Sequence, residues 1–271
     1  MNKWIASKNV NSSAALRLFC FPYAGGAATI YRDWQAALPN GVEVCPILLP
    51  GRGSRFSEPA VSDLGVLVEQ LADGLSSYLD RPSCFFGYSM GAMIAFELAR
   101  AMRARGSKHL AHLFLGARKG PVRMQRSPRA TPMSDGDFLQ QLRALNGMTQ
   151  VGGDNDEMVK LMLPTLRADM TVVQNYRYED LPPLPCGITV LGGTADPAAS
   201  REELLRWRAQ TLGTFRLHML EGDHFFINTH RDAVLDIVSR DLQRVLARSQ
   251  QGMTFDFPTE RVEVEATHAR Q

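Results

Sequence analysis

The chain has 271 residues, a hydrophobic fraction of 45%, a charged fraction of 21% and a formal net charge of +2. These values are ordinary for a globular domain, and a charge so close to zero argues against a nucleic-acid-binding protein. No apolar stretch approaches the roughly 18 residues that a membrane span requires, and the N-terminal residues lack the apolar segment of a signal peptide. We therefore expect a soluble, cytoplasmic protein that does not bind a membrane.

Six short apolar segments recur along the chain and predict buried strands. They are Leu16–Phe21, Val42–Leu48, Ser83–Phe86, Leu110–Leu115, Ile188–Leu191 and Phe215–Leu220. Several of them are apolar at every position, which is typical of strands that are covered on both faces. Because longer amphipathic segments separate them, we predict an α/β fold with a mostly parallel sheet flanked by helices.

The amphipathic segments between the strands predict four helices. They cover Ser62–Leu79, Met90–Arg105, Ser200–Trp207 and Arg231–Arg248. Ser200 followed by Glu203 has the spacing of a capping box, and Gly106 is suited to end the second helix.

Residues 120–185 interrupt this alternation and contain no convincing strand. Two helical patterns fall within them, near Phe138–Leu145 and Glu157–Tyr178. We expect a helical insertion that forms a lid. The predicted organisation is a domain over residues 1–248, followed by a flexible C-terminal tail over residues 249–271.

The four cysteines form no C-x-x-C pair and lie mostly in predicted strands. This spacing gives no sign of a zinc site or of a disulfide framework. We expect reduced thiols that pack as small apolar side chains.

The sequence Gly87-Tyr88-Ser89-Met90-Gly91 matches the pattern G-x-S-x-G. Its context is informative, since it follows a predicted strand and opens a predicted helix. A sharp turn at this point forces the central serine into a strained conformation and raises its hydroxyl above the sheet. We therefore predict Ser89 as a nucleophile.

A serine hydroxyl needs a base, and the base needs an orienting acid. His224 and Asp196 each follow a later predicted strand, in the chain order Ser, Asp, His of the α/β-hydrolase fold. Parallel strands bring such positions to one edge of a sheet. Asp223, beside His224, is an alternative acid, although neighbours on a tight loop seldom face each other.

Acyl transfer also needs donors for the oxyanion that develops on the substrate. The backbone amide of Met90 directly follows the nucleophile. The loop Pro22–Gly26 follows the first predicted strand, and its glycines allow a close backbone approach. We predict the amides of Met90 and Ala24 as the oxyanion hole; the alternative for Pro22–Gly26 is an ordinary tight turn.

Five segments together resemble the type II thioesterases that accompany nonribosomal peptide and polyketide synthases. They read LFCFPYAGGAATIYRDW, LLPGRGSRFSEP, FFGYSMGAMIAFELAR, LGGTADP and EGDHFFI. The resemblance implies an α/β-hydrolase fold with a helical lid and the catalytic residues Ser89, Asp196 and His224, with Ala24 and Met90 as oxyanion donors.

The same resemblance implies a stand-alone editing enzyme. We expect a monomer, and the mechanism requires neither cofactor nor metal. Its partner would be an acyl or peptidyl carrier protein whose 4′-phosphopantetheine arm carries the thioester. Alternatives are a small-ester carboxylesterase, a fatty-acid-type acyl-carrier thioesterase, a cyclising thioesterase and a catalytically inactive binding protein.

Two positions depart from the family's pattern. Many relatives have histidine where this chain has Tyr88, which raises a question about the shape of the pocket. A Ser-Gly-Arg-like segment is often present where this chain has Leu115-Gly116-Ala117-Arg118. These departures leave the acyl preference open.

A basic segment leads into the predicted lid. It contains Arg118, Lys119, Arg123, Arg126 and Arg129 and no acidic residue. One hypothesis is that this segment docks an acidic carrier protein; the alternative is a solvated basic loop.

Overall fold

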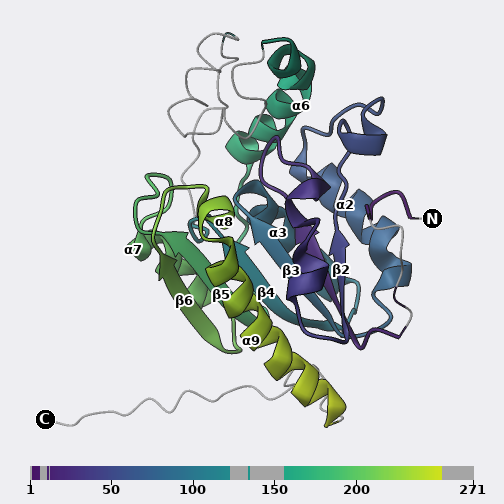
Figure 1. Ribbon diagram of the computed structural model, residues 1–271, viewed down its shortest axis with the longest axis vertical. Coiled ribbons are helices and arrows are strands. Elements are labelled where there is room, and N and C mark those ends of the chain that lie inside the picture. Colours follow the sequence, from purple (N-terminus) through teal and green to yellow (C-terminus); the bar gives the residue numbers. More distant parts are fainter. Residues whose placement is uncertain (1, 7–10, 12, 123–133, 135–155, 252–271) are drawn as a thin grey trace, which may run out of the picture.

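The computed structural model describes residues 2–6, 11, 13–122, 134 and 156–251, which are arranged around one parallel sheet (Figure 1). Its six strands lie in the order β2-β1-β3-β4-β5-β6. Their bounds are β1 Leu16–Phe21, β2 Val42–Pro46, β3 Ser83–Tyr88, β4 Leu110–Gly116, β5 Gly187–Gly193 and β6 Phe215–Leu220. All six predicted strands are confirmed. The largest differences lie at strand ends: β2 ends two residues earlier than predicted, and β3 and β5 each end two residues later.

Helices connect the strands and cover both faces of the sheet. The α-helices are α1 Trp34–Ala37, α2 Leu64–Leu75, α3 Met90–Ala104, α6 Asp156–Asn175, α7 Arg201–Leu205, α8 Phe226–Thr229 and α9 Arg231–Gln250. Short 3₁₀ helices are η1 Ala28–Tyr31, η2 Gly53–Arg55, η3 Ser76–Tyr78 and η4 Arg206–Gln210. The predicted capping box is present: Ser200 Oγ accepts from Glu203 N at 3.3 Å, and Glu203 Oε2 accepts from Ser200 N at 3.1 Å. None of the described helices combines the length and apolarity needed to cross a membrane.

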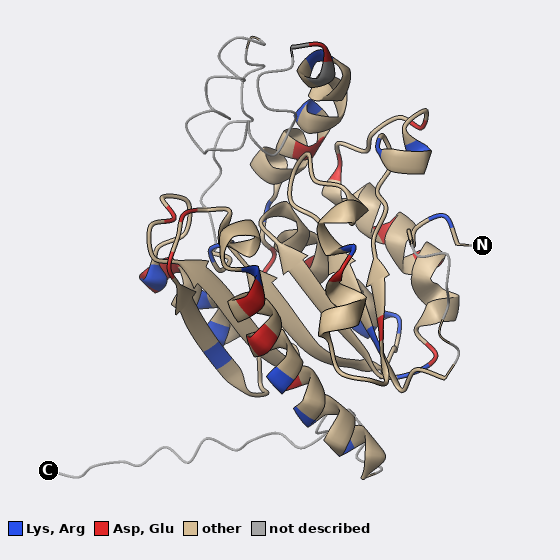
Figure 2. Ribbon diagram, in the orientation of Figure 1, with Lys and Arg blue, Asp and Glu red and all other residues tan. Residues whose placement is uncertain are grey.

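Two apolar cores lie on opposite faces of the sheet. In β1, Phe19 and Phe21 pack with α2 and α3, whereas Leu18 and Cys20 pack with α1 and α9. This alternation explains why β1 is buried at every position. The central strands β3, β4 and β5 contain no Lys, Arg, Asp or Glu (Figure 2).

The strand order reverses between β1 and β3. From β1 the chain continues to β2 on one side and then returns to β3 on the other, so the loops after β1 and β3 diverge. Phe21 and Gly87 are paired where these two strands end. In open α/β sheets, ligands bind in the crevice at the carboxyl ends of the strands on either side of such a reversal.

Between β4 and β5, the described residues form one long helix, α6 Asp156–Asn175, in place of the predicted Glu157–Tyr178. It lies beyond the carboxyl ends of the strands (Figure 1). The other predicted helix of the insertion, Phe138–Leu145, lies outside the described residues. At the C-terminal end, α9 continues to Gln250, two residues past the predicted domain boundary, and residues 252–271 also lie outside the described part.

Candidate active site

Ser89 occupies a sharp turn between β3 and α3. Its backbone has φ 53° and ψ −112°, a left-handed conformation that residues with a side chain rarely adopt. Its N–H donates to the carbonyl of Gly116 at the end of β4, at 2.8 Å. Neighbouring structure thus holds a strained conformation in place, as is common at functional sites.

The glycines on either side of Ser89 are required by close backbone contacts. A Cβ at Gly87 would lie 2.2 Å from the carbonyl oxygen of Gly91. A Cβ at Gly91 would lie 2.1 Å from the carbonyl oxygen of Phe21. The first turn of α3 therefore abuts the end of β1, which brings Ser89 beside the loop that follows β1.

His224 lies between Ser89 and Asp196. Its Nε2 is 3.0 Å from Ser89 Oγ, and its Nδ1 is 2.9 Å from Asp196 Oδ2. A carboxylate only accepts, so Nδ1 carries the proton and Nε2 is left to accept from the serine hydroxyl. The three residues come from the loops after β3, β5 and β6 and meet at one edge of the sheet. The serine of this arrangement is aligned with a base that could remove its proton.

The alternative acid, Asp223, forms a hydrogen bond within its own turn. Its Oδ1 accepts from the N–H of Phe225 at 2.8 Å. Asp196 is directed inward, with a side chain that has no exposed surface and a second oxygen that accepts from Ala198 N at 2.8 Å. Of the two carboxylates, it is Asp196 that the fold brings to the imidazole.

Tyr88 forms hydrogen bonds with the loop that carries His224. Its side chain is fully buried, and its hydroxyl donates to the carbonyl of His224 at 2.8 Å and accepts from Ile227 N at 3.4 Å. Burial raises the pKa of this phenol, so the hydroxyl keeps its proton. From the sequence, Tyr88 was expected to affect the shape of the pocket. The structure instead places its side chain in the apolar core that includes α9, next to the loop that carries His224.

The two predicted oxyanion donors lie on loops that approach each other. Met90 is the first residue of α3, where helix geometry leaves the N–H without an intrahelical partner. Ala24 follows β1 and is partly exposed. Neither amide has a hydrogen-bond acceptor among the residues that the structure describes. Both amides are therefore candidates for the predicted oxyanion hole.

A buried ion pair beside the Ala24 loop was not predicted. Asp169 on α6 and Arg52 in the loop after β2 form two hydrogen bonds, at 2.7 and 2.9 Å, and Asp169 also accepts from Gly25 N at 2.7 Å. The segment LPGRGSR formed part of the family resemblance, and an arginine in such a glycine-rich loop was the only sign in the sequence that Arg52 has a structural role. Nothing in the sequence indicated its partner Asp169, which lies 117 residues away.

The structure describes only two residues of the basic segment that leads into the insertion. Arg118 is largely buried: one guanidinium nitrogen lies 3.5 Å from Met93 Sδ, and its pKa is lowered by burial. Lys119 is half-exposed and lies 3.8 Å from Glu203. Arg118 therefore exposes only part of its side chain to solvent, which weakens the docking hypothesis; Arg123, Arg126 and Arg129 lie outside the described residues.

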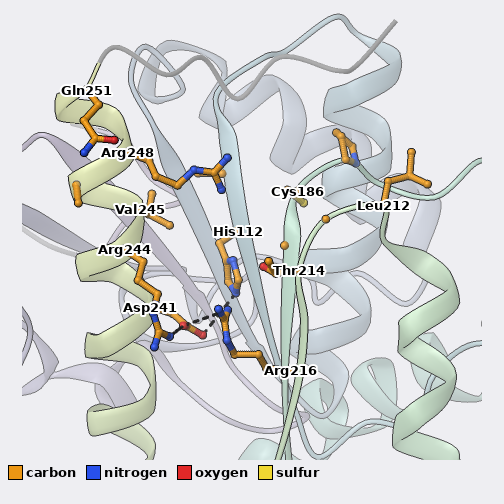
Figure 3. A pocket seen from close by; sticks show the side chains of 15 residues that line it. His112, Cys186, Leu212, Thr214, Arg216, Asp241, Arg244, Val245, Arg248 and Gln251 are labelled. Carbon is orange, nitrogen blue, oxygen red and sulfur yellow. Dashed lines mark hydrogen bonds and ion pairs between the residues drawn. The ribbon is translucent and has the colours of Figure 1, made fainter. Parts of the chain in front are cut away.

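A cavity of about 700 Å³ lies at the opposite edge of the sheet, at the amino ends of β4, β5 and β6 (Figure 3). Asp241 of α9 lies there between Arg216 and Arg244, and it accepts from Thr189 Oγ1 at 2.6 Å. Thr189 in turn is 2.8 Å from His112 Nε2. These contacts join α9 to the sheet, so we assign them to stability. Among the described residues, no group of three or more His, Cys, Asp and Glu is placed to hold a metal ion.

The parallel sheet, the turn at Ser89 and the Ser–His–Asp arrangement at its carboxyl edge define an α/β hydrolase. A family model described as the thioesterase domain matches residues 16–242. The chain belongs to the thioesterase family, whose members hydrolyse thioesters, and within it to the type II thioesterases.

Individual relatives match over nearly their whole length. Linear gramicidin dehydrogenase LgrE of Brevibacillus parabrevis is 40% identical over 90% of this chain and 94% of its own. Gramicidin S biosynthesis protein GrsT of Aneurinibacillus migulanus is 39% identical over 91% and 96%. The solved structure of the type II thioesterase BorB from the borrelidin biosynthetic cluster is 35% identical, with a TM-score of 0.77 over 88% of this chain and 97% of BorB. The name of LgrE denotes an oxidoreductase, whereas the family model and BorB agree with a site suited to acyl transfer.

Proposed function

We propose that this protein hydrolyses acyl thioesters on the 4′-phosphopantetheine arm of acyl or peptidyl carrier proteins, and so frees nonribosomal peptide or polyketide synthases from unwanted acyl groups. The observation that carries the proposal is the imidazole of His224, within hydrogen-bond distance of both Ser89 and Asp196. The relatives support the substrate class, since GrsT is named for gramicidin S biosynthesis and BorB belongs to a borrelidin cluster. The enzyme acts as a monomer, with the carrier protein as its partner.

The reaction begins when His224 Nε2 takes the proton of Ser89 and the alkoxide attacks the thioester carbonyl. The amides of Ala24 and Met90 stabilise the oxyanion. The carbon–sulfur bond breaks, the pantetheine sulfur takes the proton from His224, and an acyl-serine remains. Water then attacks the acyl-serine, with His224 again as base, and releases the acid and Ser89. Asp196 orients the imidazole and stabilises its protonated form.

The test is hydrolysis of a panel of acyl-carrier proteins by the wild type and by Ser89→Ala. We expect the variant to lose on the order of 10⁴–10⁶-fold in kcat, since the covalent route is removed. Ser76→Ala is the matched control, because the Ser76 hydroxyl is exposed and donates only to the carbonyl of Asp73. A Ser89→Ala rate within about tenfold of the wild type would refute the nucleophile.

The same panel separates the alternatives. An editing enzyme prefers carrier-bound short acyl groups over free p-nitrophenyl esters and releases linear acids. Equal rates on the free esters would indicate a carboxylesterase, a preference for long acyl chains would indicate a fatty-acid-type thioesterase, and ring products would indicate a cyclising enzyme.

A further inference from the structure

A carboxylate from the insertion reaches the loop of the predicted oxyanion hole. Asp169, on α6, is 3% exposed and accepts from Gly25 N, the residue after Ala24, at 2.7 Å. The same oxygen, Oδ2, accepts from Arg52 Nη1 at 2.9 Å, and Oδ1 accepts from Arg52 Nη2 at 2.7 Å. All three donors lie at the carboxyl edge of the sheet, whereas α6 belongs to the insertion between β4 and β5.

Arg52 completes the contact from the other side. Its Nη1 also donates to the carbonyl of Gly26 at 3.0 Å. The Gly25 amide and the Gly26 carbonyl are therefore both held, one by each member of the ion pair. Thr165, one turn before Asp169 on α6, donates to the carbonyl of Gly51 at 2.8 Å. The helix is thus joined at two points to the loop that carries Arg52.

These bonds determine where the Ala24 N–H points. The carbonyl of Tyr23 and the N–H of Ala24 belong to one planar, trans peptide and so point in opposite directions. The Tyr23 carbonyl accepts from Gly26 N at 2.8 Å, which closes a turn over residues 23–26. Gly25 adopts φ 74° within this turn. Holding Gly25 and Gly26 keeps this turn closed, and the closed turn directs the Ala24 N–H away from it.

We propose that Asp169 is a positioning residue of the oxyanion hole, and that the hole is fully formed only while α6 is seated on the loops after β1 and β2. The inference rests on the proposed function, because it needs Ala24 as an oxyanion donor. Replacing a buried ion pair with apolar residues often costs no stability, so stability alone does not explain why this pair is present. Its carboxylate instead aligns one particular backbone amide, the kind of preorganisation on which oxyanion stabilisation depends.

The experiment compares Asp169→Ala and Asp169→Asn with the wild type on an acyl-carrier substrate. A misplacement of about 1 Å can cost on the order of 10²-fold in rate, so we expect kcat to fall about 10–100-fold in Asp169→Ala while KM changes little. Asp169→Asn keeps an acceptor for Gly25 N and should lose less. A boronic acid forms a tetrahedral adduct with Ser89 and places an oxygen in the oxyanion hole. Its affinity for each Asp169 variant should fall by the same factor as the kcat of that variant.

Asp241→Asn is the control, because Asp241 is an equally buried carboxylate with arginine partners at the other edge of the sheet. It should keep the kcat and the boronate affinity of the wild type. If Asp169→Ala fails to fold, the isosteric Asp169→Asn still provides the comparison. Wild-type kcat in the Asp169 variants, or a lower kcat with unchanged boronate affinity, would overturn the inference while leaving the function intact. Retention of activity by Ser89→Ala would instead overturn the proposed function.

Discussion

A single hydroxyl group joins the histidine loop to the strand that leads into the nucleophile. Tyr88 immediately precedes Ser89, and its hydroxyl holds the carbonyl of His224 at 2.8 Å. The ring also packs against Phe226, with 5.2 Å between ring centroids. The position of the imidazole is therefore fixed by the residue next to the nucleophile as well as by Asp196.

Removing that hydroxyl tests the link. In Tyr88→Phe the His224 carbonyl is left buried without its donor, which costs about 1–3 kcal/mol of the free energy of unfolding. We expect kcat to fall about tenfold as the imidazole loses alignment. Tyr31→Phe is the matched control, since Tyr31 is equally buried and donates to the Phe21 carbonyl at the same 2.8 Å. It should lose similar stability but keep its kcat, and equal kcat values for the two variants would contradict the role of Tyr88.

At the scale of elements, α9 is joined to β4 and β5 by a chain of hydrogen bonds that runs from His112 through Thr189 to Asp241. Thr189 donates its one hydroxyl proton to Asp241, so His112 Nε2 must be the donor to Thr189. Burial lowers the pKa of His112 to about 4, although the nearby Asp241 carboxylate opposes this shift. The neutral imidazole is therefore part of the native packing.

This pKa predicts an acid sensitivity of stability. In the unfolded chain His112 titrates near its ordinary pKa of about 6.5, so between that value and about 4 the unfolded state binds a proton that the native state does not. Stability is therefore lost as the pH falls through this window. We expect the Tm of His112→Gln, which keeps a donor but cannot titrate, to fall less between pH 7 and pH 5 than that of the wild type. His109→Gln, at an exposed position three residues earlier, should behave like the wild type; equal slopes for all three proteins would contradict the prediction.

For the whole molecule, the four cysteines report on global unfolding because they are distributed over both cores. All four are free and buried, as predicted, with Cys20 and Cys84 in one core and Cys45 and Cys186 in the other. Burial raises the pKa of each thiol, for Cys186 to about 12. We expect no reaction with a disulfide reagent in the native state and release of four thiols at the denaturant midpoint measured by circular dichroism. Rapid labelling of any one thiol without denaturant would show local opening of that core.

The sequence predicted the sheet well because most of its strands are buried on both faces and are therefore largely apolar; β6, which is half-buried throughout, is the exception. It also predicted the positions of Ser89, Asp196 and His224, since each follows a strand and parallel strands end at one edge. The contacts of Asp169 with Gly25 and of Tyr88 with His224 could not be predicted in this way. They join residues 144 and 136 positions apart, and no periodicity or spacing encodes which carbonyl or amide a buried side chain will meet.

The contact between Arg52 and Asp169 limits how the insertion can be exchanged. Arg52 belongs to the loop after β2, whereas its counterion arrives with α6. A chimera that received residues 120–185 from a donor without an acid at the equivalent of Asp169 would bury a guanidinium with no counterion, at a cost of about 3–5 kcal/mol. Grafting a new insertion onto this scaffold to change its substrates would therefore require that one carboxylate to be transferred with it.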